Sequence, residues 1–272
     1  MNLQDIAIQA LNLTLMFSVG LELDLDRLRR AASRRVLLGL ATLVNFVVVP
    51  LVAYGTGTAL GLAPPILAGL LLAAVAPGGG TGTLLTRTSA GNLELSVVLL
   101  GIFTGLAVPI VPLLVVLLVP GESVSLRPLL QTLLVFQLAP LALGVGIRLL
   151  RPPLAHRLDR LARPLSNLIF GGLVLGLLVT RGHLVPEVGA TGLLAQNIVI
   201  VVSLAVPLAG RLSAGDRAAL SLTTGVRNLS LALLLSSAFF TDTTTLAVLT
   251  YGLFMYLLGV PLALLLKRRA QR

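Results

Sequence analysis

Long apolar stretches, punctuated by Gly, Pro and Arg, occupy most of the 272-residue chain. A helix that spans a bilayer needs about 20 mostly apolar residues, and by this criterion the chain divides into nine spans. Their approximate ranges are 3–21, 36–58, 64–86, 93–118, 127–149, 164–180, 190–210, 217–238 and 244–266. Membrane-spanning barrels would instead show short segments of alternating polarity. The pattern therefore predicts an all-α membrane protein with nine transmembrane helices.

Two of these spans contain residues that disfavour a continuous helix. The third span contains Ala76-Pro77-Gly78-Gly79-Gly80-Thr81-Gly82-Thr83. The eighth contains Thr223-Thr224-Gly225-Val226-Arg227-Asn228-Leu229-Ser230. Proline removes a backbone donor, and each glycine lowers helix propensity by about 1 kcal/mol. We expect both helices to unwind near mid-membrane.

The two interrupted spans are five helices apart, so an alternating topology makes them enter the membrane in opposite directions. This arrangement predicts one transporter domain over residues 1–272, with helices 1–4 and 6–9 as inverted repeats and helix 5 unpaired. Paired interruptions indicate a mid-membrane binding site. The alternative is that Gly and Pro only allow kinks or close packing. The candidate substrate-binding residues are Thr81, Thr83, Thr223, Thr224, Arg227 and Asn228.

Arg227 is a charged residue well inside a predicted span. Placing such a charge in a membrane costs at least about 2.5 kcal/mol, so the side chain should face a polar cavity or a partner. Two roles remain open, and they are compatible: an ion pair with Glu94, or direct binding of an anionic solute. Glu94 is also a candidate proton-coupling site if burial disfavours its charged form.

Composition supports a membrane location and excludes several functions. Hydrophobic residues make up 56% of the chain, charged residues 11%, and the mean hydropathy is +1.01, whereas soluble domains are about 25% charged. The net charge of +10 comes with few aromatics and no Trp, so no nucleic-acid partner is expected. There is no Cys, and His156 and His183 fall in loops on opposite sides. We expect no catalytic centre, metal or cofactor.

Basic residues are distributed unequally between alternate loops, and cytoplasmic loops collect Lys and Arg. One side of the predicted membrane topology holds most of the basic residues, and the opposite side holds only Arg127 and Arg181. This difference predicts an N-terminus outside and a C-terminus in the cytoplasm, with the protein in the inner (plasma) membrane. The first span has no Lys or Arg before it and is expected to be a retained helix. The basic side holds Arg27, Arg29, Arg30, Arg34, Arg35, Arg87, Arg148, Arg151, Arg157, Arg160, Arg163, Arg211, Arg217, Lys267, Arg268, Arg269 and Arg272.

Three motifs resemble those of the bile acid:sodium symporter family. They are Met16-Phe17-Ser18-Val19-Gly20-Leu21, then Pro77-Gly78-Gly79 followed by Gly91-Asn92 and Leu95-Ser96, and finally Thr223-Thr224-Gly225-Val226-Arg227-Asn228. The likeness extends over nearly the whole chain. It implies a core domain and a panel domain, with the two broken helices crossing in the core. It also implies secondary transport of a small organic anion by alternating access.

The chain departs from this family at the positions that the resemblance assigns to sodium ligands. One site would fall on Gly82, Thr83, Ser96, Leu100 and Thr223, and the other on Asn45, Thr223 and Arg227. The family's carboxylate is replaced by Thr223, and a guanidinium stands four residues later, so the region should repel a cation. We expect Arg227 to occupy the position of a sodium ion and transport to be uncoupled from sodium. The alternative function is a transport-inactive membrane scaffold or sensor that retains the fold.

Overall fold

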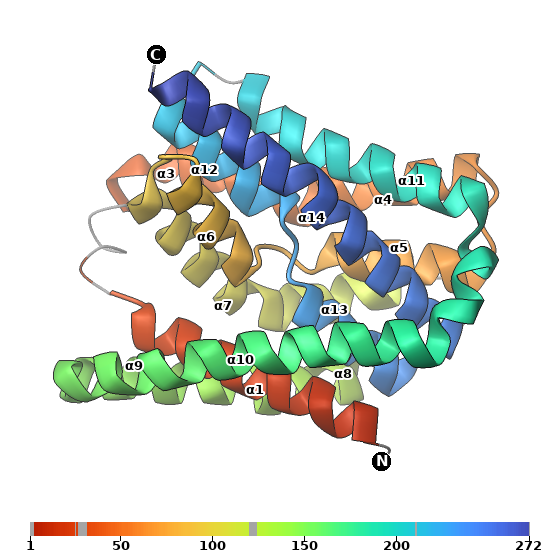
Figure 1. The fold of residues 1–272 in the computed structure, drawn as a ribbon, viewed down its shortest axis with the longest axis horizontal. Helices are drawn as coiled ribbons and strands as arrows, with labels where there is room; N and C mark the ends of the chain where they lie inside the picture. Colours follow the sequence, from red (N-terminus) through yellow and green to blue (C-terminus); the bar gives the residue numbers. More distant parts are fainter. Residues whose placement is uncertain (1–2, 25, 27–31, 120–123, 210, 272) are drawn as a thin grey trace.

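The computed structural model describes residues 3–24, 26, 32–119, 124–209 and 211–271, and helices account for nearly all of them (Figure 1). Four of the arginines used to predict the orientation, Arg27, Arg29, Arg30 and Arg272, lie outside the described residues.

The first half of the chain runs from α1 to α7. α1 covers Leu3–Glu22, and a 3-10 turn, η1, covers Ala32–Arg34. One continuous rod then consists of α3 (Arg35–Leu43), a π-helical turn, η2 (Val44–Val48), and α4 (Val49–Ala59). The interrupted third span consists of α5 (Pro64–Val75) and α6 (Gly80–Thr88), and α7 covers Leu93–Leu118.

The second half repeats this mixture of long and interrupted helices. A second rod consists of α8 (Leu126–Leu133), a π-helical turn, η3 (Leu134–Leu138), and α9 (Ala139–Leu150). α10 covers Pro152–Arg181 and leads through η4 (Gly182–Leu184) to α11 (Val185–Ala205) and η5 (Val206–Ala209). The chain ends with α12 (Ala214–Gly225), α13 (Leu229–Phe239) and α14 (Asp242–Ala270).

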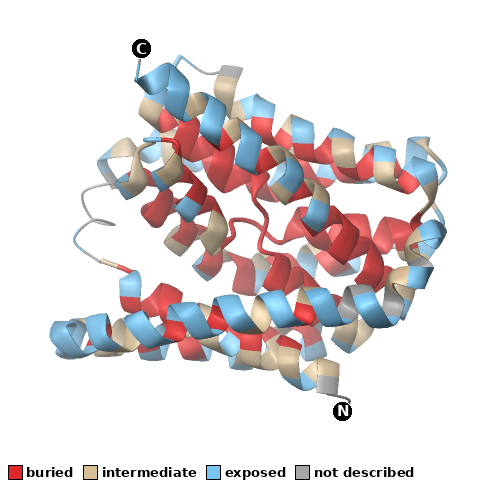
Figure 2. Cartoon of the chain, in the orientation of Figure 1, coloured by how far each residue is buried: buried red, intermediate tan, exposed pale blue. Residues whose placement is uncertain are grey.

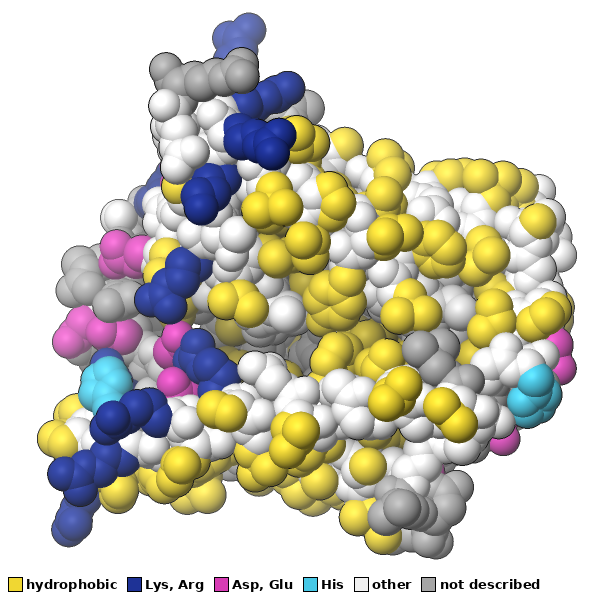
Figure 3. Space-filling model, viewed as in Figure 1, with side chains coloured by type: hydrophobic (Ala, Val, Ile, Leu, Met, Phe, Trp, Pro, Cys, Tyr) yellow, Lys and Arg dark blue, Asp and Glu magenta, His cyan; other side chains and the backbone are white. Residues whose placement is uncertain are grey.

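Several of these rods are long and apolar enough to cross a bilayer. Among the described residues, six qualify, over 35–59, 93–118, 126–150, 185–208, 214–239 and 242–270, and the bent pair α5–α6 makes a seventh. α1 and α10 overlap two further predicted spans but are not in that count. The chain is therefore a multi-pass membrane protein, and the number nine stays a prediction. Basic side chains gather at one end of the face in Figure 3, beside a broad apolar surface.

Two groups of helices pack closely among themselves, and they also contact each other, since α1 packs against α13. α1 packs closely against α9 and α10, and these three helices form a layer along the lower edge of Figure 1. The approach of α1 to α9 requires glycines, because a Cβ on Gly20 would collide with the Leu141 carbonyl. In the second group, α14 packs against α5 and α11, and α12 packs against α6 and α11. Figure 2 shows that burial is densest in α5, α12 and α13, around the two interruptions.

The π-helical turn η2 has a local cause and a consequence for the site. Val49 donates its N–H to the Val44 carbonyl, in the wider π pattern, and Pro50 has no N–H to donate. The carbonyl of Asn45 is thereby left without its usual α-helical or π-helical donor. A π turn that frees a buried backbone acceptor is typical of functional positions.

Both predicted interruptions are confirmed. α5 ends at Val75, and Gly78 has φ +56°, a left-handed conformation that favours glycine. α6 begins at Gly80 with its axis bent by 62° from that of α5. In the other span, Val226 (ψ 95°) and Asn228 (ψ 83°) have extended rather than helical ψ angles between α12 and α13.

Candidate functional site

The two interruptions bond directly to each other. Gly79 N donates to the Val226 carbonyl at 2.9 Å, and Asn228 N donates to the Ala76 carbonyl at 3.0 Å. The backbones are so close that a Cβ on Gly79 would lie 2.6 Å from the Arg227 carbonyl oxygen. Two segments almost 150 residues apart in sequence are thus held together through backbone groups that a continuous helix would have used internally.

Arg227 lies at this junction, and its side chain is only 1% exposed. A guanidinium has five N–H donors, and five contacts to oxygen use them. Nε donates to Ala73 O (3.3 Å), Nη1 to Asn45 Oδ1 (2.7 Å) and Thr224 O (3.3 Å), and Nη2 to Asn45 O (3.3 Å) and Ala74 O. We call Arg227 and these four acceptor residues the guanidinium cage.

The cage acceptors are available because they lie where helices end or bulge. The last four carbonyls of a helix have no intrahelical partner. Ala73 and Ala74 are in the last turn of α5, and Thr224 is in the last turn of α12. The Asn45 carbonyl is freed by η2 and Pro50. Helix C-termini also carry partial negative charge, so two helix ends and a bulge together favour a cation at this point.

This geometry changes the expectations for Arg227 and Glu94. The described acceptors of Arg227 are all uncharged and they occupy its donors, so no N–H remains for an ion pair with Glu94 or for a solute. Glu94 lies exposed in the first turn of α7. It lacks the burial on which the proton-coupling hypothesis depended, although its neighbours Leu95 and Ser96 in the same turn are buried.

A second cluster contains only hydroxyl groups. Ser96 Oγ donates to Thr83 Oγ1 at 3.2 Å and forms a hydrogen bond with Thr223 Oγ1 at 3.0 Å, and all three residues are buried. We call Thr83, Ser96 and Thr223 the hydroxyl cluster. Gly82 lets α6 approach this point, because a Cβ there would lie 2.9 Å from Leu222 O. Of the predicted ion-site positions, three thus lie in the hydroxyl cluster and two, Asn45 and Arg227, in the guanidinium cage, whereas Gly82 and Leu100 belong to neither.

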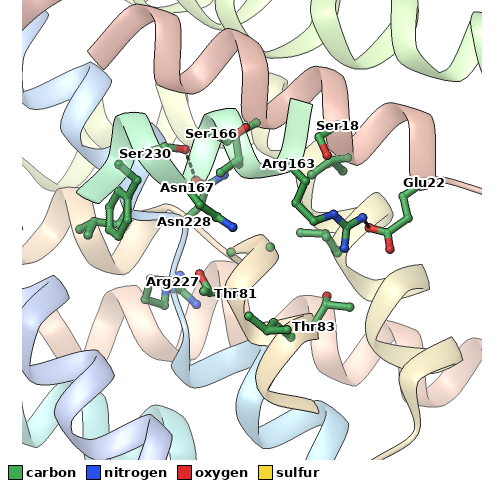
Figure 4. Close-up of a pocket in the computed structure, with 18 of the residues that line it drawn as sticks. Ser18, Glu22, Thr81, Thr83, Arg163, Ser166, Asn167, Arg227, Asn228 and Ser230 are labelled. Atoms are coloured by element: carbon green, nitrogen blue, oxygen red, sulfur yellow. Dashed lines mark hydrogen bonds and ion pairs between the residues drawn. The ribbon is translucent and has the colours of Figure 1, made fainter. Parts of the chain in front are cut away.

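Beside the two interruptions lies a cavity of about 150 Å³, and Figure 4 shows part of its lining. Among the predicted site residues, Thr81, Thr83, Leu100, Arg227 and Asn228 border it. The others do not: Asn45, Gly82, Ser96, Thr223 and Thr224 lie in the surrounding packing. Thr81 Oγ1 also forms a hydrogen bond with the Tyr256 hydroxyl at 2.9 Å.

Asn228 connects the junction to the cavity. Its Oδ1 accepts from Leu231 N at 3.2 Å and from Ser230 Oγ at 2.8 Å, which caps α13. Because Oδ1 accepts from a backbone N–H, Nδ2 is fixed on the other side, and Figure 4 shows it directed into the cavity. The residue is 2% exposed. The cavity is thus bordered by an amide donor and by the start of α6, at Gly80.

The opposite wall of the cavity was missed by sequence reasoning. α1 contributes Leu15, Ser18, Val19 and Glu22, and α10 contributes Arg163, Ser166, Asn167 and Phe170. Both sets have the spacing i, i+3, i+4, i+7 of one helix face. The signal was therefore present in the sequence, as two mixed polar and apolar stripes. We call these eight residues the α1–α10 wall.

These features define a class, a multi-pass membrane transport protein whose two broken helices meet beside a cavity. The sequence matches the sodium bile acid symporter family over residues 10–188, and the chain belongs to that family. The family resemblance of the three sequence motifs is thereby confirmed.

Curated relatives agree with this assignment. A probable chloroplastic sodium/metabolite cotransporter of Oryza sativa subsp. japonica, BASS2, is 31% identical over 49% of this chain and 32% of its own length. The sodium-dependent transporter YocS of Bacillus subtilis (strain 168) is 32% identical over 38% of this chain and 32% of its own. A probable chloroplastic sodium/metabolite cotransporter of Arabidopsis thaliana, BASS1, is 37% identical over 36% of this chain and 25% of its own length. The matches thus span a third or less of these relatives.

Proposed function

We propose that the protein is a secondary transporter that carries a small organic anion across the inner (plasma) membrane by alternating access. The observation that carries this proposal is the cavity between the α1–α10 wall and the two joined interruptions. Interrupted helices of transporters form solute sites at such junctions. A cavity of about 150 Å³ can hold a molecule the size of benzene, which favours a solute of about six non-hydrogen atoms.

Several features of the cavity favour a negatively charged solute. The start of α6 borders it, and helix N-termini attract anions through their free N–H groups and dipole. Asn228 Nδ2 offers a donor, and Thr81 and Thr83 offer hydroxyl groups. Arg87 and Arg163 also border the cavity. These groups would donate hydrogen bonds to a carboxylate and compensate its charge.

The layer of α1, the rod α8–α9 and α10 is our candidate for the panel domain, and the remaining helices are our candidate for the core. Helices 1–4 and 6–9 would then be inverted repeats with α8–α9 unpaired, and the single domain would extend over 1–272. Rocking of one group against the other would expose the cavity to either side. We place the N-terminus outside and the C-terminus in the cytoplasm.

We further propose that transport does not require sodium. The names of the three relatives describe sodium-coupled or sodium-dependent proteins, and sodium needs several oxygen ligands and a compensating negative charge. In this chain the oxygens of the guanidinium cage are already bonded to a fixed cation, and the hydroxyl cluster has no carboxylate. A permanently bound guanidinium would supply at all times the charge that a sodium ion supplies only when bound.

Uptake of radiolabelled C3–C6 carboxylates by proteoliposomes tests both parts of the proposal. We expect saturable uptake that is unchanged when sodium is replaced by potassium on both sides. Sodium-dependent uptake would refute the uncoupled mechanism and leave the carrier assignment in place. Carboxylate binding without uptake would instead identify the scaffold or sensor. The double variant Thr223→Glu with Arg227→Gln restores a carboxylate and removes the guanidinium, and it should make carboxylate uptake respond to sodium.

A further inference from the structure

The α1–α10 wall carries an ion-pair network at its charged end. Arg163 Nη2 donates to Glu22 Oε2 and to Asp159 Oδ2, both at 2.9 Å. Ser18 Oγ donates to the other oxygen of Asp159 at 2.5 Å. The network therefore joins the last turn of α1 to α10 through one guanidinium.

The two carboxylates have different positions relative to the cavity. Glu22 and Arg163 both border it, whereas Asp159 does not. Asp159 lies one turn before Arg163 on the same helix, and its side chain is 21% exposed and held by Ser18. Glu22 is 41% exposed. Asp159 thus binds Arg163 from a position away from the cavity. Glu22 and Arg163 lie next to each other at the cavity, as Figure 4 shows.

The contact between Glu22 and Arg163 is suited to exchange. Both residues are about two-fifths exposed, and ion pairs with that much solvent contribute little net stability. Both carboxylates contact the same nitrogen, Nη2, so neither makes the two-nitrogen contact that is strongest between arginine and a carboxylate. An incoming carboxylate that makes such a contact would replace Glu22 at little cost.

Arg163 also differs from the other cations of the cavity. Arg227 has its donors occupied inside the guanidinium cage. Arg87 lies on α6, in the helix that carries the opposite wall. Arg163 is the cation that belongs to the α1–α10 layer, so an anion that it binds would bridge from that layer to Asn228 and the start of α6. Such a bridge couples solute occupancy to the contact between the two groups of helices.

We propose that Arg163 determines the specificity for a carboxylate-bearing solute and that Glu22 is the internal ligand which the solute displaces. The Glu22–Arg163 pair holds the empty site, and the solute carboxylate exchanges with Glu22 when it binds. This inference rests on the proposed transport of a small organic anion and identifies the residue that selects the charged group.

The test measures binding and uptake separately on the purified full chain. Thermal stabilisation is recorded with butyrate and with butyramide, an uncharged molecule of the same number of non-hydrogen atoms, and with the C3–C6 mono- and dicarboxylates. We expect Arg163→Gln to weaken butyrate binding about tenfold or more, as the loss of a charged hydrogen bond does. Glu22→Gln should strengthen it severalfold, because the internal competitor is gone. Butyramide should be unaffected in both.

Two further variants separate a solute contact from a structural ion pair. Glu22→Arg combined with Arg163→Glu rebuilds the pair in reverse, and we expect folding but no recovery of butyrate binding. Arg160→Gln changes an exposed arginine of α10 that does not border the cavity, and it should leave binding within about twofold. Recovery by the reversed pair would overturn the inference, because it would show a purely structural role.

The outcomes also distinguish this inference from the proposed function. Butyrate binding that depends on Arg163 without any uptake supports the inference and refutes transport. Carboxylate uptake that is indifferent to Arg163→Gln refutes the inference and leaves transport standing. If no carboxylate stabilises the wild type, Arg163 selects no carboxylate and the inference is refuted.

Discussion

At the two interruptions, helix C-termini face the buried Arg227 side chain, whereas a helix N-terminus faces the cavity. On one side, the C-terminal turns of α5 and α12 direct their carbonyls at Arg227, whose guanidinium N–H groups all have acceptors and which is only 1% exposed. On the other side, α6 begins at the cavity, where Asn228 presents a donor. The same break in a helix thus encloses a cation at one end and, on the function we propose, leaves an open site for an anion at the other.

This difference shows how a membrane helix can be broken without a bound metal ion. Unpaired backbone groups in a membrane interior cost several kcal/mol each, and the guanidinium satisfies those on the carbonyl side. On the N–H side, Asn228 caps α13, and we propose that the start of α6 is left for a solute. If the comparison is correct, changes on the carbonyl side should damage folding, and changes on the N–H side should damage binding.

The largest effect is expected from Arg227→Met. The variant removes the donor from five oxygen contacts, and buried acceptors without partners cost about 1–3 kcal/mol each. After partial relaxation we expect a loss of about 3 kcal/mol or more in unfolding free energy, measured by thermal unfolding in detergent. The unfolding free energy of Arg227→Lys should lie between those of this variant and the wild type, because lysine keeps the charge but has fewer donors.

Arg211→Met is the matched control for this prediction. Arg211 is exposed, and replacing it should change the unfolding free energy by less than about 0.5 kcal/mol. A wild-type melting temperature for Arg227→Met would mean that water or a bound ion satisfies the helix ends equally well. The guanidinium of Arg227 would then not be required to satisfy the carbonyl groups at these helix ends.

Asn45→Ala should have the next largest effect. Asn45 Oδ1 accepts from Arg227 at 2.7 Å, and Nδ2 donates to Ala41 O and Thr224 Oγ1. Loss of a buried hydrogen bond to a charged group predicts destabilisation of about 2 kcal/mol in chemical or thermal unfolding. Among the described residues, the Asn197 side chain bonds to its own helix, at Leu193 O, and Asn197→Ala should cost about 0.5 kcal/mol or less. Equal effects of the two variants would contradict a special role for the cage.

Two adjacent glycines test the contact between the interruptions without changing any charge. A Cβ on Gly79 would lie 2.6 Å from Arg227 O, whereas a Cβ on Gly80 meets nothing within 4 Å. Gly79→Ala should force the interruptions apart and cost about 1–3 kcal/mol, with loss of uptake. Gly80→Ala should leave stability unchanged or slightly raised. Stability that is the same in both variants would show that the junction tolerates separation.

The interruptions could be predicted from sequence because their causes are local. Pro77 and its following glycines, and the polar residues around Arg227, disfavour helix wherever they occur, and the helix ends at Val75 and Gly225 agree. The family likeness was also readable from short motifs. By contrast, the partners of the Arg227 guanidinium include oxygens from two elements distant in sequence, α5 and η2, one of them a carbonyl freed by a π turn. No local pattern specifies which acceptors a long side chain will reach.

The position of the α1–α10 wall at the cavity could not be predicted from the sequence either. Its stripes were visible as helical spacing, but facing a cavity is a property of packing between helices. Ser18 and Glu22 could as readily have pointed at headgroups or at another helix. Identifying them as cavity residues needed the position of α1 relative to α10, which the sequence pattern does not contain.

The smallest expected effect on folding tests the open side. Asn228→Ser keeps a capping oxygen for α13 but removes the amide donor from the cavity, so we expect a stability change below about 1 kcal/mol. Carboxylate binding, measured by thermal stabilisation with butyrate, should weaken about threefold to tenfold, as loss of one neutral hydrogen bond predicts. Asn92 caps α7 in the same way, but its Nδ2 donates to Asp216 and it does not border the cavity. Asn92→Ser should therefore lower stability and spare binding. If both variants affect stability and binding in parallel, the closed and open sides are not separate in function.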